Sequence, residues 1–177
     1  PVTTRTQITA ANLPFILIPG FHDGQGGAVT GPNTIVQWTQ SGLRFAHLGD
    51  LGQDTLTDAQ LTDLQNLDVL FIPAGGFFTV DIEQAVAYAG QLGARVTILM
   101  HYRTALGGPA QLATLPAIAT PFGKVVYKAS SVVINRTSLP AAAAREGWVM
   151  EPTSNAIVVN AGGFSPGVPV APGSLAS

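Results

Sequence analysis

Hydrophobic and polar positions in the first third of the chain follow the short periods of β-strands. Segments rich in Val, Thr and Ile alternate with turns, and a polar, glycine-rich loop covers residues 21–32. Gly42 permits the positive φ of a tight hairpin turn between two of these segments. The predicted strands cover residues 2–9, 15–18, 34–39 and 43–48.

Helical and strand patterns alternate in the middle of the chain. Thr57 and Gln60 have the spacing of a capping box before an apolar stripe of leucines. A second helix is expected over 80–92, with Thr79 as its N-cap and Gly93 after its last turn. Buried strands are predicted over 69–72 and 96–100. This alternation predicts an α/β fold.

The pattern weakens after residue 104. A short helix is expected over 109–115, and an antiparallel strand pair is expected at 125–128 with 131–135. A last strand is predicted over 148–151. Pro and Gly then become frequent, which is typical of a linker. We therefore expect one domain over residues 1–152 and a linker or the start of another domain over 153–177.

Composition narrows the range of functions. Charged residues make up 10% of the 177 residues, and hydrophobic residues make up 46%. The net charge is −2 and the basic residues are scattered, which argues against a nucleic-acid surface. No apolar run approaches the roughly 18 residues of a membrane span. The chain has no cysteine, so disulfides and thiolate metal sites are excluded.

Candidate chemistry is concentrated where predicted strands end. His22 follows the second strand, Asp50 lies at the end of the fourth, and His101 follows the strand over 96–100. Two imidazoles and a carboxylate suit zinc, manganese or iron. A single histidine at a strand end is more often a hydrogen-bonded residue than a ligand, so both interpretations stay open. His47 is explained either as a hydrogen-bonded residue or as support behind a metal ligand.

Other chemistry lacks its usual motifs. The chain has no Gly-x-Ser-x-Gly elbow, no P-loop and no Gly-x-Gly-x-x-Gly opening a helix. The sequence Gly75-Gly76-Phe77-Phe78 could present backbone N–H groups to a ligand, but a plain turn explains it more simply.

In combination, four segments resemble the metallo-β-lactamase superfamily, in the branch that includes ascorbate-6-phosphate lactonase. They are GPNT at 31–34, GLRFAHLGDLG at 42–52, DVLFIPAGG at 68–76 and MHYRT at 100–104. The resemblance implies a four-layer αββα sandwich, of which this chain would be roughly the C-terminal half. It also implies a small-molecule substrate and hydrolysis of an ester, lactone or phosphoester by a metal-bound hydroxide.

The resemblance assigns roles to single residues. His22, Asp50 and His101 correspond to metal ligands of the superfamily, for one or two ions of zinc or manganese in the intact protein. His47 would support the metal site from behind. The residues expected at the substrate rim are Asn33, Phe77, Tyr102 and Arg103.

The chain departs from the superfamily in one respect. The His-x-His-x-Asp-His segment that supplies the remaining ligands is absent. We therefore expect a fragment that is inactive alone and that pairs with a missing N-terminal half or self-associates. The alternative is a non-catalytic binding or structural module of a secreted multidomain protein. Residues 156–175 resemble the opening of a β-rich domain of large secreted bacterial proteins, which favours an extracellular or periplasmic location.

Overall fold

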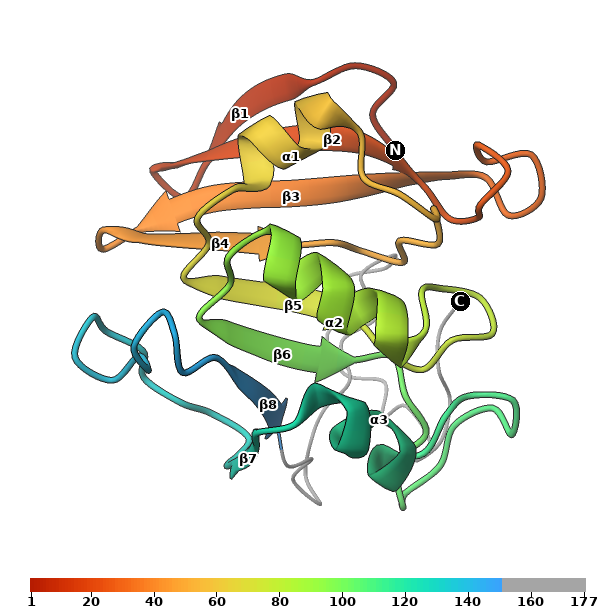
Figure 1. The fold of residues 1–177 in the computed structure, drawn as a ribbon. Coiled ribbons are helices and arrows are strands. Elements are labelled where there is room, and N and C mark those ends of the chain that lie inside the picture. Colours follow the sequence, from red (N-terminus) through yellow and green to blue (C-terminus); the bar gives the residue numbers. More distant parts are fainter. Residues whose placement is uncertain (151–177) are drawn as a thin grey trace, which may run out of the picture.

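The computed structural model describes residues 1–150 and shows one eight-stranded sheet with three helices in this part of the chain (Figure 1). The strands are β1 (Thr6–Ala10), β2 (Leu13–Phe21), β3 (Pro32–Gln40), β4 (Leu43–His47), β5 (Val69–Pro73), β6 (Val96–Met100), β7 (Val125–Lys128) and β8 (Glu146–Met150). The helices are α1 (Asp58–Leu64), α2 (Ile82–Gln91) and α3 (Leu115–Phe122). The predicted α/β class is confirmed.

Strand directions bring several loops to one edge of the sheet. The strand order is β1-β2-β3-β4-β5-β6-β8-β7. Pairing is antiparallel from β1 to β4 and parallel from β4 through to β7. Strands β2, β4, β5 and β6 therefore run in the same direction, and their carboxyl ends meet at one edge, on the right in Figure 1. We call this the site edge, because the three predicted ligands follow these strands.

The three helices cover one face of the sheet (Figure 1). Alternate residues of the strands point toward them, so that Ile35, Leu70 and Ile72 are fully buried in one core with helix residues such as Leu64 and Ala85. The capping box predicted for α1 is present in full, with Thr57 and Gln60 each bonding the other's backbone.

The opposite face carries a row of aromatic side chains from four adjacent strands, which we call the aromatic row. Its members are Phe15, Trp38, Phe45, His47 and Phe71, which share a face by strand register. Neighbouring rings lie 5.0–6.3 Å apart between centroids. Farther along this face, residues 129–145 cover a second core of β4, β5, β6 and β8, to which Ile134 and Leu139 contribute. Each ring of the row is only half-buried.

Three local predictions were wrong, each for an identifiable reason. The short helix lies at α3 rather than over 109–115, because Pro116 suits a first helical turn. β7 pairs with β8 in parallel and not with 131–135, which forms no strand. Asp81, not Thr79, caps α2, because its carboxylate accepts the Gln84 N–H at 2.9 Å. The end of the predicted last strand and the predicted linker over 153–177 lie outside the described residues.

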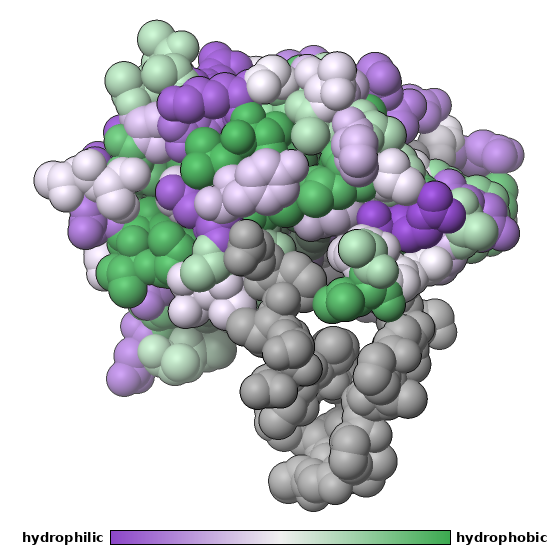
Figure 2. Space-filling model, turned by 90° about the horizontal axis from the view of Figure 1, so that it is seen from below, coloured by the Kyte–Doolittle hydropathy of each residue, from purple (hydrophilic) through white to green (hydrophobic). Residues whose placement is uncertain are grey.

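Among the described residues, no helix is both long and apolar enough to cross a bilayer. Figure 2 views the molecule from below and shows hydrophobic residues in separate patches between polar ones, where the grey residues do not cover them.

Candidate functional site at one edge of the sheet

The three predicted ligands all lie at the site edge. His22 directly follows β2, Asp50 lies three residues after β4, and His101 directly follows β6. Asp50 is exposed, whereas both histidines are half-buried. Asp50 therefore lies in the loop after β4 and not at the end of a strand, where the sequence predicted it.

His22 has an unsatisfied ring nitrogen. Its Nε2 atom is buried and has no hydrogen-bond partner. Its backbone is fixed, because the His22 N–H donates to Gly31 O at 3.0 Å and the Gly52 N–H donates to Phe21 O at 3.0 Å. A Cβ atom at Gly52 would lie 2.6 Å from the His22 carbonyl, so glycine is required for this close approach. A buried polar atom without a partner is costly in a native structure and is typical of a group that binds a ligand.

The loop after His22 is organised by one carboxylate. Asp23 accepts hydrogen bonds from the backbone N–H groups of Gln25, Gly27, Val29 and Thr30 at 2.8–3.0 Å. These bonds, with the largest contribution from the Thr30 N–H, hold the pKa of Asp23 well below its usual range. The glycine-rich loop is therefore a defined structure held by its own side chain.

Asn33 fixes the loop that carries Asp50. Its side-chain Nδ2 donates to Leu48 O at 2.8 Å, and its Oδ1 accepts the Asp50 N–H at 3.1 Å. The Asn33 side chain is buried. Its predicted place at the substrate rim stays a prediction, and its observed contacts give it a positioning role.

Two further buried amides hold the end of β2, just before His22. Gln53 Oε1 accepts the Phe21 N–H at 3.2 Å, and Gln60 Nε2 donates to Pro19 O at 2.7 Å. The two side chains also bond each other, with Gln53 Nε2 donating to Gln60 Oε1 at 2.8 Å. The Tyr88 hydroxyl donates to Gln53 O at 2.8 Å, and burial raises the pKa of Tyr88 to about 12.

Sequence reasoning missed this amide network. The capping box identified Gln60, but nothing local marks Gln53 as buried. Only its place in a polar loop between a candidate ligand and a helix start could have drawn attention to it.

His101 occupies an unusual backbone conformation. Its φ is 53°, a left-handed value that is uncommon for residues other than glycine and that often accompanies function. Its Nδ1 lies 3.5 Å from Thr79 Oγ1. The His101 carbonyl packs so closely on Gly75 that a Cβ atom there would overlap it.

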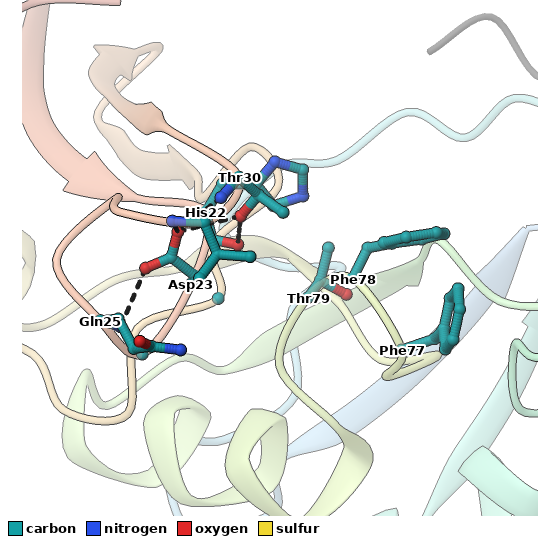
Figure 3. Close-up of a pocket in the computed structure, with 10 residues that line it drawn as sticks. His22, Asp23, Gln25, Thr30, Phe77, Phe78 and Thr79 are labelled. Atoms are coloured by element: carbon teal, nitrogen blue, oxygen red, sulfur yellow. Dashed lines mark hydrogen bonds between the residues drawn. The ribbon is translucent and has the colours of Figure 1, made fainter.

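The loop after β5 lies between the two histidines. The Val80 N–H donates to Leu51 O at 2.9 Å, and Thr79 touches His101. A pocket of about 400 Å³ opens between this loop and the loop after β2 (Figure 3). His22, Gly52 and Thr79 line it, together with Phe77 and Phe78, whereas Asp50 and His101 do not.

The described residues do not form a complete metal site. Within residues 1–150, no three His, Asp or Glu side chains come together in a group that could hold a metal ion. The orphaned Nε2 of His22 and the donor types at this edge suit a divalent metal, but further ligands would be needed.

The other predicted residues lie around the same edge. His47 is half-buried, its Nδ1 accepts the Gly49 N–H at 3.0 Å, and burial lowers its pKa while the Asp50 carboxylate partly offsets this. Burial raises the pKa of Tyr102, whose ring packs partly into the helix-side core. The Arg103 guanidinium donates to Ala110 O at 3.3 Å. Nothing in these contacts tests their predicted roles.

Comparison with known proteins identifies a family that matches this chain. Residues 2–101 match a family model described as a beta-lactamase superfamily domain. A metal-dependent hydrolase of Alkaliphilus metalliredigens is 40% identical over 63 residues, which are 36% of this chain and 27% of the relative. A metal-dependent hydrolase of Methanoculleus marisnigri is 33% identical over 113 residues, covering 59% of this chain and 48% of the relative. The chain thus spans about half or less of the length of these curated relatives.

Solved structures agree on the fold. A protein of Thermotoga maritima described as a Zn-dependent hydrolase of the metallo-β-lactamase superfamily aligns with a TM-score of 0.69 and 26% identity, over 84% of this chain and 70% of that one. A metallo hydrolase of Ignicoccus hospitalis aligns with a TM-score of 0.55 and 21% identity, over 85% of this chain and 57% of that one. The second likeness concerns the fold alone.

Proposed function

Because the chain belongs to a family of beta-lactamase superfamily domains, we propose that the protein containing it is a metal-dependent hydrolase of an ester, lactone or phosphoester. The superfamily predicted from the sequence is confirmed. The reaction class rests on the sequence resemblance to the ascorbate-6-phosphate lactonase branch and on relatives that are named metal-dependent hydrolases.

His22, Asp50 and His101 are the proposed metal ligands. The observation that carries this assignment is the buried Nε2 of His22, which has no hydrogen-bond partner. The common edge of β2, β4 and β6 supports it, since the loops after these strands carry all three residues. Imidazole and carboxylate are the ligand types that zinc and manganese accept, and we propose one of these metals.

The remaining ligands are proposed to lie in a part of the protein outside this chain. Two observations support this: no three candidate ligands of the described residues lie close enough together to hold one ion, and the chain spans only part of its relatives' length. The half-buried aromatic row would pack against that part, or against a second copy of this chain where the other part is absent.

Metal content of the intact protein tests the proposal. We expect the purified protein, after supplementation with zinc or manganese, to retain at least one ion per chain by mass spectrometry. His22→Ala, Asp50→Ala and His101→Ala should each lower the retained metal. Asp58→Asn is the matched control, because Asp58 is an exposed carboxylate in the first turn of α1 and is not one of the predicted ligands.

A protein that retains no transition metal after supplementation would overturn the proposal and favour a non-catalytic module. Equal metal loss in Asp58→Asn and in the ligand variants would show that the losses come from general destabilisation.

A further inference from the structure

The pocket beside His22 has an apolar wall that no other part of the described structure covers. Phe77 and Phe78 are 57% and 47% exposed, and their rings meet edge to face at 4.1 Å between centroids. Val29, which is 66% exposed, lines the same pocket from the loop after β2. Figure 3 shows the two rings beyond Thr79, on the side of the pocket away from His22. Exposed apolar groups gathered at one pocket are typical of ligand contacts.

The turn that presents these rings is held in an unusual conformation. Phe77 has a φ of 65°, which is rare for a bulky residue. The backbone around it is fixed, because the Gly76 N–H donates to Val80 O at 3.3 Å and the Phe78 N–H donates to Gly76 O at 2.9 Å. A simple turn would not need an aromatic side chain at this position, and an exposed Phe gains little from burial within the chain.

Apart from the metal ion proposed at His22, the same pocket offers little to an anion. Among the described residues that line it there is no Lys or Arg. A glycine-rich loop can bind phosphate through its backbone N–H groups. Here the N–H groups of Gln25, Gly27, Val29 and Thr30 are already bonded to the Asp23 carboxylate. A phosphate group would have to compete with a side chain of its own charge sign for these donors.

We propose that this pocket binds an uncharged, apolar acyl or alcohol group of the substrate, so that the protein acts on esters or lactones with such a group rather than on phosphoesters. The inference rests on the proposed function and narrows its substrate class. Phe77 and Phe78 are then specificity-determining residues that contact the substrate away from the reacting bond.

Hydrolysis by the intact, metal-supplemented protein tests the substrate class. The probes are p-nitrophenyl acetate, butyrate and octanoate, with p-nitrophenyl phosphate and bis(p-nitrophenyl) phosphate as the anionic arm. We expect kcat/KM to rise about two- to fourfold for each methylene that the pocket buries, since burial of one methylene contributes about 0.8 kcal/mol. Phe77→Ala and Phe78→Ala should flatten this dependence, with a larger loss of kcat/KM for octanoate than for acetate. Leu106→Ala is the matched control, because Leu106 is 67% exposed and does not line the pocket.

Binding without turnover separates this inference from the proposed function. In the intact protein, NMR titration with 1-hexanol and with hexyl phosphate should perturb the Phe77 and Phe78 amides more strongly with the alcohol. The double variant Phe77→Ala/Phe78→Ala should lose that response.

The possible outcomes separate the inferred substrate class from the hydrolase proposal. Phosphoester turnover that is independent of chain length, or tighter binding of hexyl phosphate, overturns the inference and leaves the hydrolase proposal standing. Turnover of none of the probes counts against the hydrolase proposal, and the hexanol titration then still decides the inference. Hexanol binding that is unchanged in the double variant overturns it, and would assign the two rings to packing against another part of the protein.

Discussion

The two faces of the sheet are buried to different degrees. Toward the helices, Leu48, Leu70 and Ile72 are completely buried, and the core is continuous from β2 to α2. On the other face, Phe45 and Phe71 are larger but only half-buried. Leu70 and Phe71 are neighbours on β5 and point to opposite faces, so one strand shows both environments. Residues 1–150 bury the helix face completely, and they cover the other face only in part.

Residues 129–145 cover only part of the second face, and this explains why its side chains are less buried than those of the helix face. Residues 129–145 are held over β4 to β8 by Arg136, which donates to Gly42 O at 2.6 Å, and by Arg95, whose Nε donates to Pro140 O at 2.8 Å. Toward β2 and β3 the described residues offer no such segment, and Phe15 and Trp38 remain half-buried. A four-layer sandwich would place its other half on this face, which agrees with the proposal that part of the domain lies outside this chain.

The largest expected effect comes from the helix face. Leu70→Ala removes a fully buried side chain and should lower the free energy of unfolding by about 2–5 kcal/mol. Phe71→Ala removes a larger side chain from the same strand, but should cost less than the roughly 3–5 kcal/mol of a fully buried phenylalanine. Urea unfolding of both variants of the chain measures the difference.

The order of these two losses is the informative result. A larger loss of unfolding free energy in Phe71→Ala than in Leu70→Ala would show that the chain itself already buries the Phe71 ring. The aromatic row would then need no partner. In the intact protein we expect the cost of Phe71→Ala to increase, because another layer would bury that ring.

A second prediction concerns a polar group inside the helix face. Asn33→Ala leaves the Leu48 carbonyl and the Asp50 N–H without their partner, and an unsatisfied buried group costs about 1–3 kcal/mol. We also expect faster hydrogen exchange at the Asp50 amide. Gln37→Ala is the control, because Gln37 is a buried amide on the same face of β3.

The exchange measurement separates positioning from general stability. Protection at Asp50 should fall in Asn33→Ala by more than the change in global stability accounts for, and it should fall only with global stability in Gln37→Ala. Equal local losses in both variants would remove the positioning role from Asn33.

Local sequence patterns predicted much of the fold. The features that they did not predict depend on pairing between segments that are distant in the sequence. The hairpin at Gly42, the capping box of α1 and the strand before His101 depend on neighbouring residues, and all three were correct. The pairing of β7 with β8 was missed because a parallel neighbour can come from any distance along the chain. The strand directions place the candidate ligands at one edge, but the buried contacts of Asn33 and Gln53 depend on tertiary packing and could not be predicted from neighbouring residues.

A smaller expected effect is the contribution of His47, on the second face, to the pH dependence of stability. Burial lowers the pKa of His47 below the 6.5 of an unfolded histidine, so the unfolded chain takes up the proton more readily. The contribution of this group to stability is therefore present above about pH 6.5 and is lost as the pH falls from there toward the folded-state pKa. His47→Gln should remove this part of the pH dependence, measured by urea unfolding between pH 8 and pH 5. The same slope in both proteins would mean that the ring is not desolvated on this face.

The smallest expected effect is local, in the exposed loop after β2. Four backbone N–H groups hold the pKa of Asp23 far below its usual value, so its stabilising contribution is present above about pH 4 and is lost only as the pH falls well below that. The NMR shifts of the Gly27 and Thr30 amides should therefore keep their hydrogen-bonded values at pH 3, where an ordinary aspartate with a pKa of about 3.9 is mostly protonated. Asp23→Asn should move these two shifts at neutral pH, and Asp58→Asn should not. A transition of both amides near pH 4 would show that the carboxylate does not organise the loop, and the N–H groups would then be free to bind an anion beside His22.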